Sequence, residues 1–214
     1  MKNFFRITFL AFIFSCVITV FVSDAHAGAY YLNDTKLARV HVILKNGETF
    51  DGKTKLPGGW YTKPIKVTPD EGKTRKFKPE EIEALVVWEK KHPDKQFVMR
   101  RITRPYYNRK GQWKHDNVQW MFAQAVGKHL TIYMGAPMYE FNRRNGTLVG
   151  LAQYNNGFSS VGVKTGAEKG VFIGNKKSLM EFLSDDPTIC RRLEANEIDS
   201  NDYQTIVDVY EPVE

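Results

Sequence analysis

Cysteine is almost absent from this chain of 214 residues, which contains Cys16 and Cys190 alone. Cys16 lies in an apolar run near the N-terminus, so the remainder of the chain has one thiol. A single thiol cannot form an internal disulfide in an exported protein. The fold must therefore be held by a hydrophobic core, and the residues after position 27 are numerous enough to bury one.

The sequence also lacks an apolar run of the length that a transmembrane helix needs, about 20 residues. Its longest run, residues 7–22, follows a basic start and contains polar positions. Ala25 and Ala27 then give the A-x-A spacing that signal peptidase reads. We predict a signal peptide over residues 1–27, a mature chain without a transmembrane segment, and a periplasmic or extracellular location.

A second reading of the N-terminus depends on Cys16. The sequence IFSC resembles the lipobox in which a cysteine becomes lipidated, although Phe14 is bulky for that motif. The apolar run continues for six residues past Cys16, whereas a lipobox usually closes the run. Lipoprotein anchoring through Cys16 is therefore the alternative to a cleaved signal peptide.

Acidic residues are scarce in the first half of the chain. The formal net charge is +7, and residues 28–128 hold 21 Lys and Arg against 11 acids. Residues 129–214 reverse the balance, with 8 basic and 12 acidic side chains. A basic half can bind a polyanion, or its lysines can keep strand edges soluble.

No catalytic constellation is present. The KTG triplet at 164–166 has no S-x-x-K before it, and the sequence contains neither H-E-x-x-H nor G-x-S-x-G. His115 and Asp116 could meet His129 across strands, but ordinary core or surface histidines are the simpler reading. We predict no metal site, no cofactor and no catalytic residue.

Turn signals divide the middle of the chain into hairpins. Asn46-Gly47 predicts a two-residue type I′ turn that pairs Ile43 with Phe50. Pro79 predicts a single helical turn before a buried strand that ends at Trp88. Gly127-Lys128 fits a type II′ turn, which places Trp120, Phe122 and Val126 on one side of a strand.

The end of the chain changes from strand to helix periodicity. Leu179, Phe182 and Leu183 have helical spacing, Asp186-Pro187 begins a second helix, and Asp199 or Ser200 caps a third. Strands followed by helices predict an α+β fold, a predominantly antiparallel β meander (sandwich or open barrel) with a C-terminal cluster of short helices. The predicted units are a basic β-hairpin unit over 28–118 and a meander with helical tail over 119–214, or one domain comprising both.

One stretch, residues 100–114, interleaves arginine with aromatic residues. Arginine binds carboxylate, sulfate or phosphate groups bidentately, and aromatic rings stack on sugars. For an exported protein an anionic glycan or envelope polymer is the expected partner, and nucleic acid is not. The alternative is a scaffold in which arginine stems cover apolar surface. The candidate ligand-binding residues are Arg100, Arg101, Arg104, Tyr106, Tyr107, Arg109, Trp113 and Lys114.

Three segments together resemble a group of exported proteins of unknown function that is common in Gram-negative gut anaerobes. They are VILKNGETFDGKTKLP, KPIKVTPDEGKTRKFKPEEIEALVVW and LMEFLSDDPTICRRLEANEIDSNDYQTIVDVY. The capped helical tail carries the most specific part of the likeness, through Phe182, Asp185, Pro187, Asp202, Ile206, Val207 and Tyr210. The chain departs from the pattern in lacking a second aromatic residue beside Phe182 and in its terminal EPVE. The resemblance implies an exported, β-rich, non-catalytic protein and assigns no active-site residue.

These observations favour an exported binding or structural protein of the bacterial cell envelope, more readily than an enzyme. The alternative is a hydrolase that processes envelope glycans or peptides through carboxylates that the sequence does not single out. Two carboxylates of perturbed pKa in one pocket would indicate the hydrolase, and a shallow face of aromatic and basic residues would indicate the binder.

Overall fold

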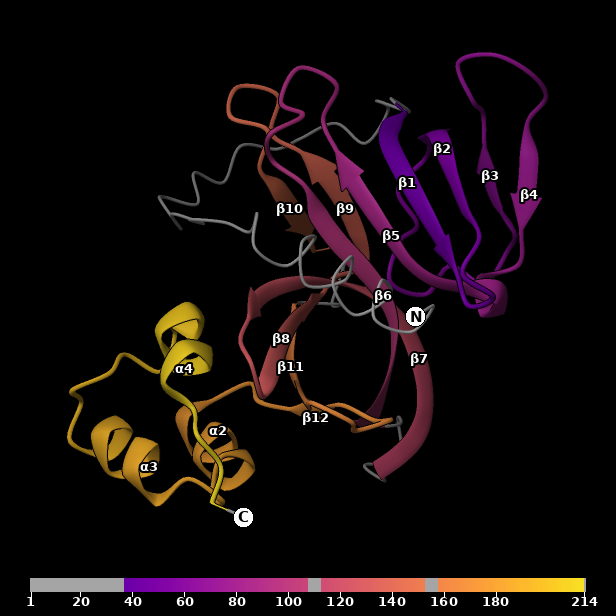
Figure 1. Ribbon diagram of the computed structural model, residues 1–214. Helices are drawn as coiled ribbons and strands as arrows, with labels where there is room; N and C mark the ends of the chain where they lie inside the picture. Colours follow the sequence, from indigo (N-terminus) through magenta and orange to yellow (C-terminus); the bar gives the residue numbers. More distant parts are fainter. Residues whose placement is uncertain (1–36, 108–112, 153–157, 214) are drawn as a thin grey trace, which may run out of the picture.

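The structure, a computed structural model, describes residues 37–107, 113–152 and 158–213. Its largest element is an eight-stranded antiparallel sheet of order β12-β11-β8-β7-β6-β5-β1-β2, and two hairpins form separate small sheets (Figure 1). The strands are β1 (Ala38–Leu44), β2 (Thr49–Thr54), β3 (Ile65–Val67), β4 (Arg75–Phe77), β5 (Ile82–Trp88), β6 (Phe97–Tyr107), β7 (Trp113–Val126), β8 (Leu130–Gly135), β9 (Met138–Phe141), β10 (Leu148–Leu151), β11 (Ser159–Lys164) and β12 (Val171–Phe172). A 3-10 turn, η1 (Pro79–Glu81), precedes β5, and the helices α2 (Lys176–Phe182), α3 (Pro187–Glu194) and α4 (Tyr203–Val209) follow β12. The predicted α+β fold is confirmed.

The main sheet is open at one end and rolled at the other. Strands β6, β7, β8, β11 and β12 curve round into a ring, which Figure 1 shows almost end-on. The backbone N–H of Gly170, just before β12, donates a 2.9 Å hydrogen bond to the carbonyl of Thr103 on β6. The ring is thereby closed, while β5, β1 and β2 continue as a flat extension. A sandwich and an open barrel are the alternatives that the sequence predicts, and the observed sheet is rolled at one end and open at the other.

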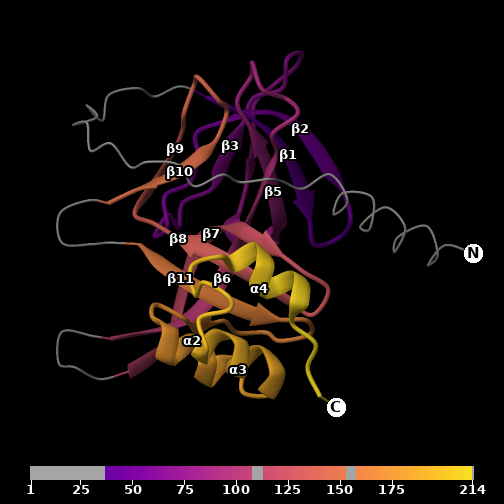
Figure 2. The same ribbon diagram turned by 90° about the vertical axis from the view of Figure 1, so that its left-hand side faces the viewer.

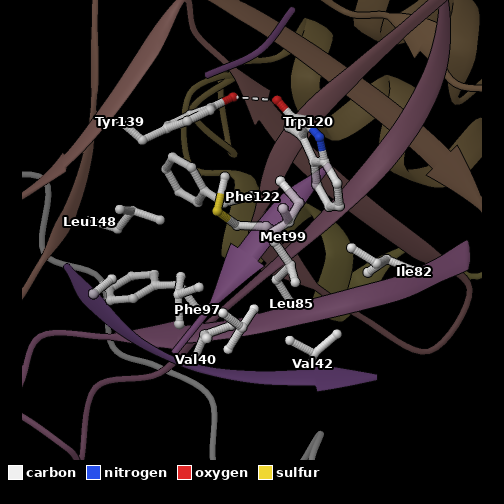
Figure 3. Packing of buried hydrophobic residues seen from close by; sticks show 14 of the residues in the cluster. Val40, Val42, Ile82, Leu85, Phe97, Met99, Trp120, Phe122, Tyr139 and Leu148 are labelled. Atoms are coloured by element: carbon white, nitrogen blue, oxygen red, sulfur yellow. Dashed lines mark hydrogen bonds between the residues drawn. The ribbon is translucent and has the colours of Figure 1, made fainter. Parts of the chain in front are cut away.

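The first core fills the space between the flat extension and the two hairpins, β3–β4 and β9–β10 (Figure 3). Alternate residues of β1, β5 and β6 point into it, as expected for strands with one buried face. The hairpins add apolar residues from the facing side. Its buried members include Val40, Val42, Leu85, Val87, Phe97, Met99, Trp120, Phe122, Tyr139, Phe141 and Leu148.

The second core joins the helical tail to the outer face of the ring (Figure 2). Short helices bury an apolar stripe only by packing on another element, and here that element is β7–β8. The buried residues are Ala125, Leu130 and Ile132 from the strands, with Ile173, Leu179, Leu183, Ile189, Leu193, Ile198, Ile206, Val207 and Tyr210 from the tail. The prediction that the tail packs on the sheet is confirmed.

The predicted register of the first hairpin is wrong by one residue. Phe50 pairs with Val42, and Ile43 pairs with Thr49. Gly47 has a φ of 88°, whereas Asn46 is not among the described non-glycine residues with positive φ, so the I′ geometry is not formed. The loop instead has three residues, and the Asn46 side chain accepts a 3.0 Å hydrogen bond from the backbone N–H of Glu48. This register places Phe50 on the core side of β2.

The predicted type II′ turn at Gly127 is also wrong. The backbone N–H of Gly127 donates to the carbonyl of Leu130, so Lys128 and His129 are the central residues. A Cβ on Gly127 would lie 2.2 Å from the carbonyl oxygen of Val207, so this glycine admits α4 against the strand. Between Ala123 and Ala125 the β7–β8 pairing also shifts register. This irregularity moves Val126 to the face opposite Trp120 and Phe122, in contrast to the prediction.

The helix cap was predicted correctly in one of the three tail helices. Asp186 caps α3 by accepting from the N–H groups of Thr188 and Ile189 at 3.0 and 3.1 Å, with Pro187 in the first turn. The start of α2 was not assigned a cap from the sequence, and Asn175 provides it. For α4 the cap is Asp202, not Asp199 or Ser200, because the Asp199 side chain turns to the N–H of Asn201.

The boundary predicted after residue 118 falls inside β7, so the two predicted units share a strand. Their division into domains stays a prediction. Within the described ranges, no helix has the length and apolar character needed to cross a membrane.

Candidate functional site: the two ends of β6

Strand β6 presents its arginines on two different faces. Ile102 belongs to a small cluster inside the ring, and Arg100 and Arg104 share its side because they lie two residues away on either side. Arg101 pairs with Trp120, a residue of the first core, and therefore lies on the opposite face. The predicted arginines do not form one surface: Arg100 and Arg104 are brought to the interior face, and Arg101 is not.

An apolar plug separates the two interior arginines. It consists of Ile102, Met121, Ala123, Tyr133 and Val161, which come from β6, β7, β8 and β11. Because these side chains fill the middle of the ring, Arg100 and Arg104 lie towards its two different ends. Each end is thus a separate candidate site with one arginine.

At one end, Arg104 is fixed by a buried amide. Its Nε donates a 2.9 Å hydrogen bond to Oε1 of Gln119, whose side chain is 3 % exposed. The guanidinium lies 5.8 Å from the ring centroid of Trp60. Burial lowers the pKa of Arg104, but a guanidinium stays charged at physiological pH. The result is a partly desolvated cation held in one position.

Trp60 and Phe158 make this end aromatic and accessible, with 47 % and 57 % of their surface exposed. The backbone positions Trp60, because Gly59 donates to the carbonyl of Ala136 at 3.1 Å and accepts from the N–H of Trp120 at 2.9 Å. Phe158 lies close to the same Ala136, since a Cβ on Gly150 would be 2.7 Å from Ala136 Cβ and 3.0 Å from the Phe158 ring. We call Trp60, Arg104 and Phe158 the aromatic–arginine surface.

Four of the remaining predicted site residues lie where the described pairing of β6 with β7 ends. Tyr106 pairs with Lys114 and Tyr107 pairs with Trp113 in the strand register. The side chains of these four residues, and the whole of Arg109, lie outside the described residues. They stay predictions.

No group of three or more His, Cys, Asp or Glu side chains that could hold a metal ion occurs in the part of the chain that the structure describes. His129 lies 3.3 Å from Glu211, and His41 lies 2.8 Å from Asp51. The side chains of His115 and Asp116, the other members of the considered cluster, lie outside the described residues. Cys190 is half-buried on α3, and its Sγ faces the carbonyls of Met180 and Leu183.

Two residues of the aromatic–arginine surface were missed by the sequence analysis. Trp60 lies in the segment LPGGWY, which the turn residues identify only as a loop, and Phe158 begins a strand segment. A large aromatic residue directly after two glycines indicates an exposed aromatic side chain, because loops lie on the protein surface. Its proximity to Arg104, 44 positions later, has no local signature.

Comparisons of the chain with protein-family models, with curated proteins and with solved structures gave no significant match. The resemblance to exported proteins of gut anaerobes therefore stays a prediction, and the functional argument depends on the geometry of the molecule.

Proposed function

We propose that this chain is an exported, non-catalytic binding protein of the bacterial cell envelope whose partner is an anionic glycan. The observation that carries the proposal is the pairing of Arg104 with the exposed ring of Trp60 at 5.8 Å. An aromatic face stacks on the apolar face of a sugar, and an adjacent guanidinium binds its carboxylate or sulfate group.

Preorganisation supports a binding role for this surface. Arg104 is held through its Nε by Gln119. The backbone hydrogen bonds of Gly59 fix the chain directly before Trp60. Less side-chain entropy is then lost when a ligand binds, because the arginine is already fixed. Exposed, unpaired surface arginines lack this advantage.

The pKa shifts of the described carboxyl groups support the hydrolase alternative less than the binding protein. Asp70 and Asp185 are the described carboxyl groups whose pKa departs clearly from its usual value, and both are lowered. A general acid of a glycosidase needs a raised pKa so that it carries a proton at neutral pH. The described acids therefore favour ion pairing over proton transfer.

The proposal is tested by measuring binding to immobilised polygalacturonate, dextran sulfate and neutral dextran. We expect the two acidic polymers to bind and neutral dextran not to bind. Binding should weaken as salt rises, because charge interactions are screened over about 10 Å at 0.1 M salt. Arg104→Gln should weaken binding about tenfold or more, since it removes a charged hydrogen-bond donor. Trp60→Ala should weaken binding without lowering the melting temperature, because the ring is exposed.

Arg75→Gln is the matched control. Arg75 also lies over aromatic rings, 5.0 Å from Phe50 and 5.1 Å from Phe77, but on the β3–β4 hairpin. It should bind the polymers as the wild type does. The proposal fails if Arg75→Gln loses as much affinity as Arg104→Gln, because the attraction would then be general, or if Trp60→Ala binds normally.

Export is tested separately. N-terminal sequencing of the protein from its native cell should begin at Gly28, after removal of residues 1–27. A mature chain that begins with lipidated Cys16 would instead identify a lipoprotein.

A further inference from the structure

A pocket of about 750 Å³ opens at the end of the ring that contains Arg100. Val126, Thr131 and Val163 form one wall, because they are neighbours in register across β7, β8 and β11. Tyr133, two residues further along β8, lies at the border between the pocket and the apolar plug. The volume falls within the range of about 300–1,000 Å³ that is typical of small-molecule sites.

Arg100 brings an incompletely compensated positive charge to this pocket. Among the described residues it pairs with Glu83, with 3.5 Å between Nη2 and Oε1, longer than the usual 2.7–3.2 Å of an N–H···O hydrogen bond. Its Nε is buried and has no hydrogen-bond partner. The side chain is 30 % exposed, so part of the guanidinium is accessible. A partly buried, weakly paired arginine attracts an anion.

The other lining groups suit the body of a small polar molecule. Tyr133 lines the pocket together with Arg100, and burial raises its pKa, so it stays a neutral phenol that can donate and accept. Thr131 adds a second hydroxyl beside it on β8, two residues away on the same face. The side chains of Val126 and Val163 add an apolar surface against which a ring can lie.

Charge at the rim favours an anion with one negative charge. Asp208 lines the pocket on the side of α4, and Glu83 lies behind Arg100. Two lysines also line the pocket. The side chain of Lys128 is 76 % exposed, so solvent screens its charge, and Lys164 is paired with Asp185 at 2.6 Å. A phosphate dianion would meet more repulsion from the two acids than a carboxylate does.

We propose that this pocket binds a sugar acid, a monosaccharide with one carboxylate, which Arg100 holds while Tyr133 and Thr131 bind its hydroxyl groups. The apolar face of the sugar lies against Val126 and Val163. This site shares no residue with the aromatic–arginine surface, and the proposal does not depend on the proposed function.

The test is isothermal titration calorimetry of the purified protein with glucuronate, glucose and acetate. We expect glucuronate alone to bind, because glucose lacks the carboxylate and acetate lacks the hydroxyl groups. Arg100→Gln should weaken glucuronate binding about ten- to hundredfold, and Thr131→Val should weaken it about three- to tenfold. The valine keeps the shape and strand propensity of threonine, so its effect is separable from misfolding.

Arg101→Gln is the control, because Arg101 is the next residue on the strand and lies on the opposite face. It should bind glucuronate as the wild type does. The proposal is overturned if the folded wild type does not bind glucuronate, if glucose or acetate binds equally well, or if Arg100→Gln retains full affinity. Loss of polymer binding in Trp60→Ala with normal glucuronate binding would separate the two sites.

Discussion

The hydroxyl of Tyr139 donates a 2.7 Å hydrogen bond to the backbone carbonyl of Trp120 (Figure 3) and accepts one of 2.9 Å from the backbone N–H of Ala136. The last pair in the ladder between β7 and β8 is Met121 with Gly135, so the adjacent residues Trp120 and Ala136 are not paired across the two strands. Gly59 lies between these two residues, donating to the carbonyl of Ala136 and accepting from the N–H of Trp120. A tyrosine hydroxyl and a loop peptide therefore satisfy the backbone groups that the ladder leaves, directly beneath the aromatic–arginine surface.

Tyr139→Phe should destabilise the protein by about 1–3 kcal/mol, because it leaves buried backbone groups without a partner. Urea unfolding followed by circular dichroism measures the change. Tyr61→Phe is the control, since Tyr61 is 39 % exposed and its hydroxyl remains accessible to water. Equal stability of Tyr139→Phe and the wild type would show that water replaces the hydroxyl.

Local signals predicted the elements of this fold well. The hairpin around Gly47, the turn at Pro79 with the strand to Trp88, and the capped helix at Asp186 all follow from residues adjacent in sequence. Their physics is local: a glycine with positive φ, a proline at a helix start, and a carboxylate that accepts from free N–H groups.

Long-range features were predicted less well. The register shift between Ala123 and Ala125 places Val126 on the opposite face of the sheet from the one predicted. The hydrophobic pattern of the sequence does not indicate a single shift of this kind. Closure of the ring through Gly170 and Thr103 joins residues that are 67 positions apart. The candidate site follows the same rule: Arg104 was identified from composition, whereas Trp60 becomes its neighbour only through the tertiary fold.

Gly127→Ala should destabilise the contact between α4 and the ring. The added Cβ would lie 2.2 Å from the Val207 carbonyl oxygen. Because this atom belongs to the backbone of a packed helix, moving it away destabilises the packing. We expect a loss of about 1–3 kcal/mol from overpacking and a faster hydrogen exchange of α4 amides. Gly166→Ala is the comparison, because at φ 82° it meets nothing within 4 Å and is strained in its backbone alone. Faster exchange in α4 with Gly166→Ala as well would contradict the contact model.

Asp70 should titrate with a pKa of about 2 in the folded protein. Hydrogen bonds from Lys53, at 2.7 Å, and Arg39, at 2.5 Å, favour its charged form. Titration followed by NMR of the carboxyl carbon measures this value. In Lys53→Met the pKa of Asp70 should rise towards that of an ordinary aspartate, and in Lys66→Met, whose strand partner is Lys76, it should change less. An unchanged pKa in Lys53→Met would show that Arg39 alone sets it.

The helical tail is tied to the ring by a polar contact as well as by its core. Asp185 directly precedes Asp186, the N-cap of α3, and its Oδ2 accepts a 2.6 Å hydrogen bond from Lys164 on β11 and a 2.7 Å bond from the Tyr210 hydroxyl. Burial opposes the ionisation of Asp185, and the two hydrogen bonds outweigh it, so its pKa lies below the usual value. Burial, together with the hydrogen bond to Asp185, raises the pKa of Tyr210.

Asp185→Asn should therefore destabilise the protein in a pH-dependent way. A carboxyl group whose pKa is lower in the folded state than in the unfolded chain stabilises the fold above its unfolded pKa, near 4, and this stabilisation is lost as pH falls through the folded value. The wild type should exceed Asp185→Asn in stability at pH 7, and the difference should shrink towards zero as pH falls below about 4. Urea unfolding at a series of pH values measures this, with Asp94→Asn as the exposed control, whose difference from the wild type should stay small throughout. A difference that is constant with pH would mean that Asp185 acts by shape and hydrogen bonding alone, without its charge.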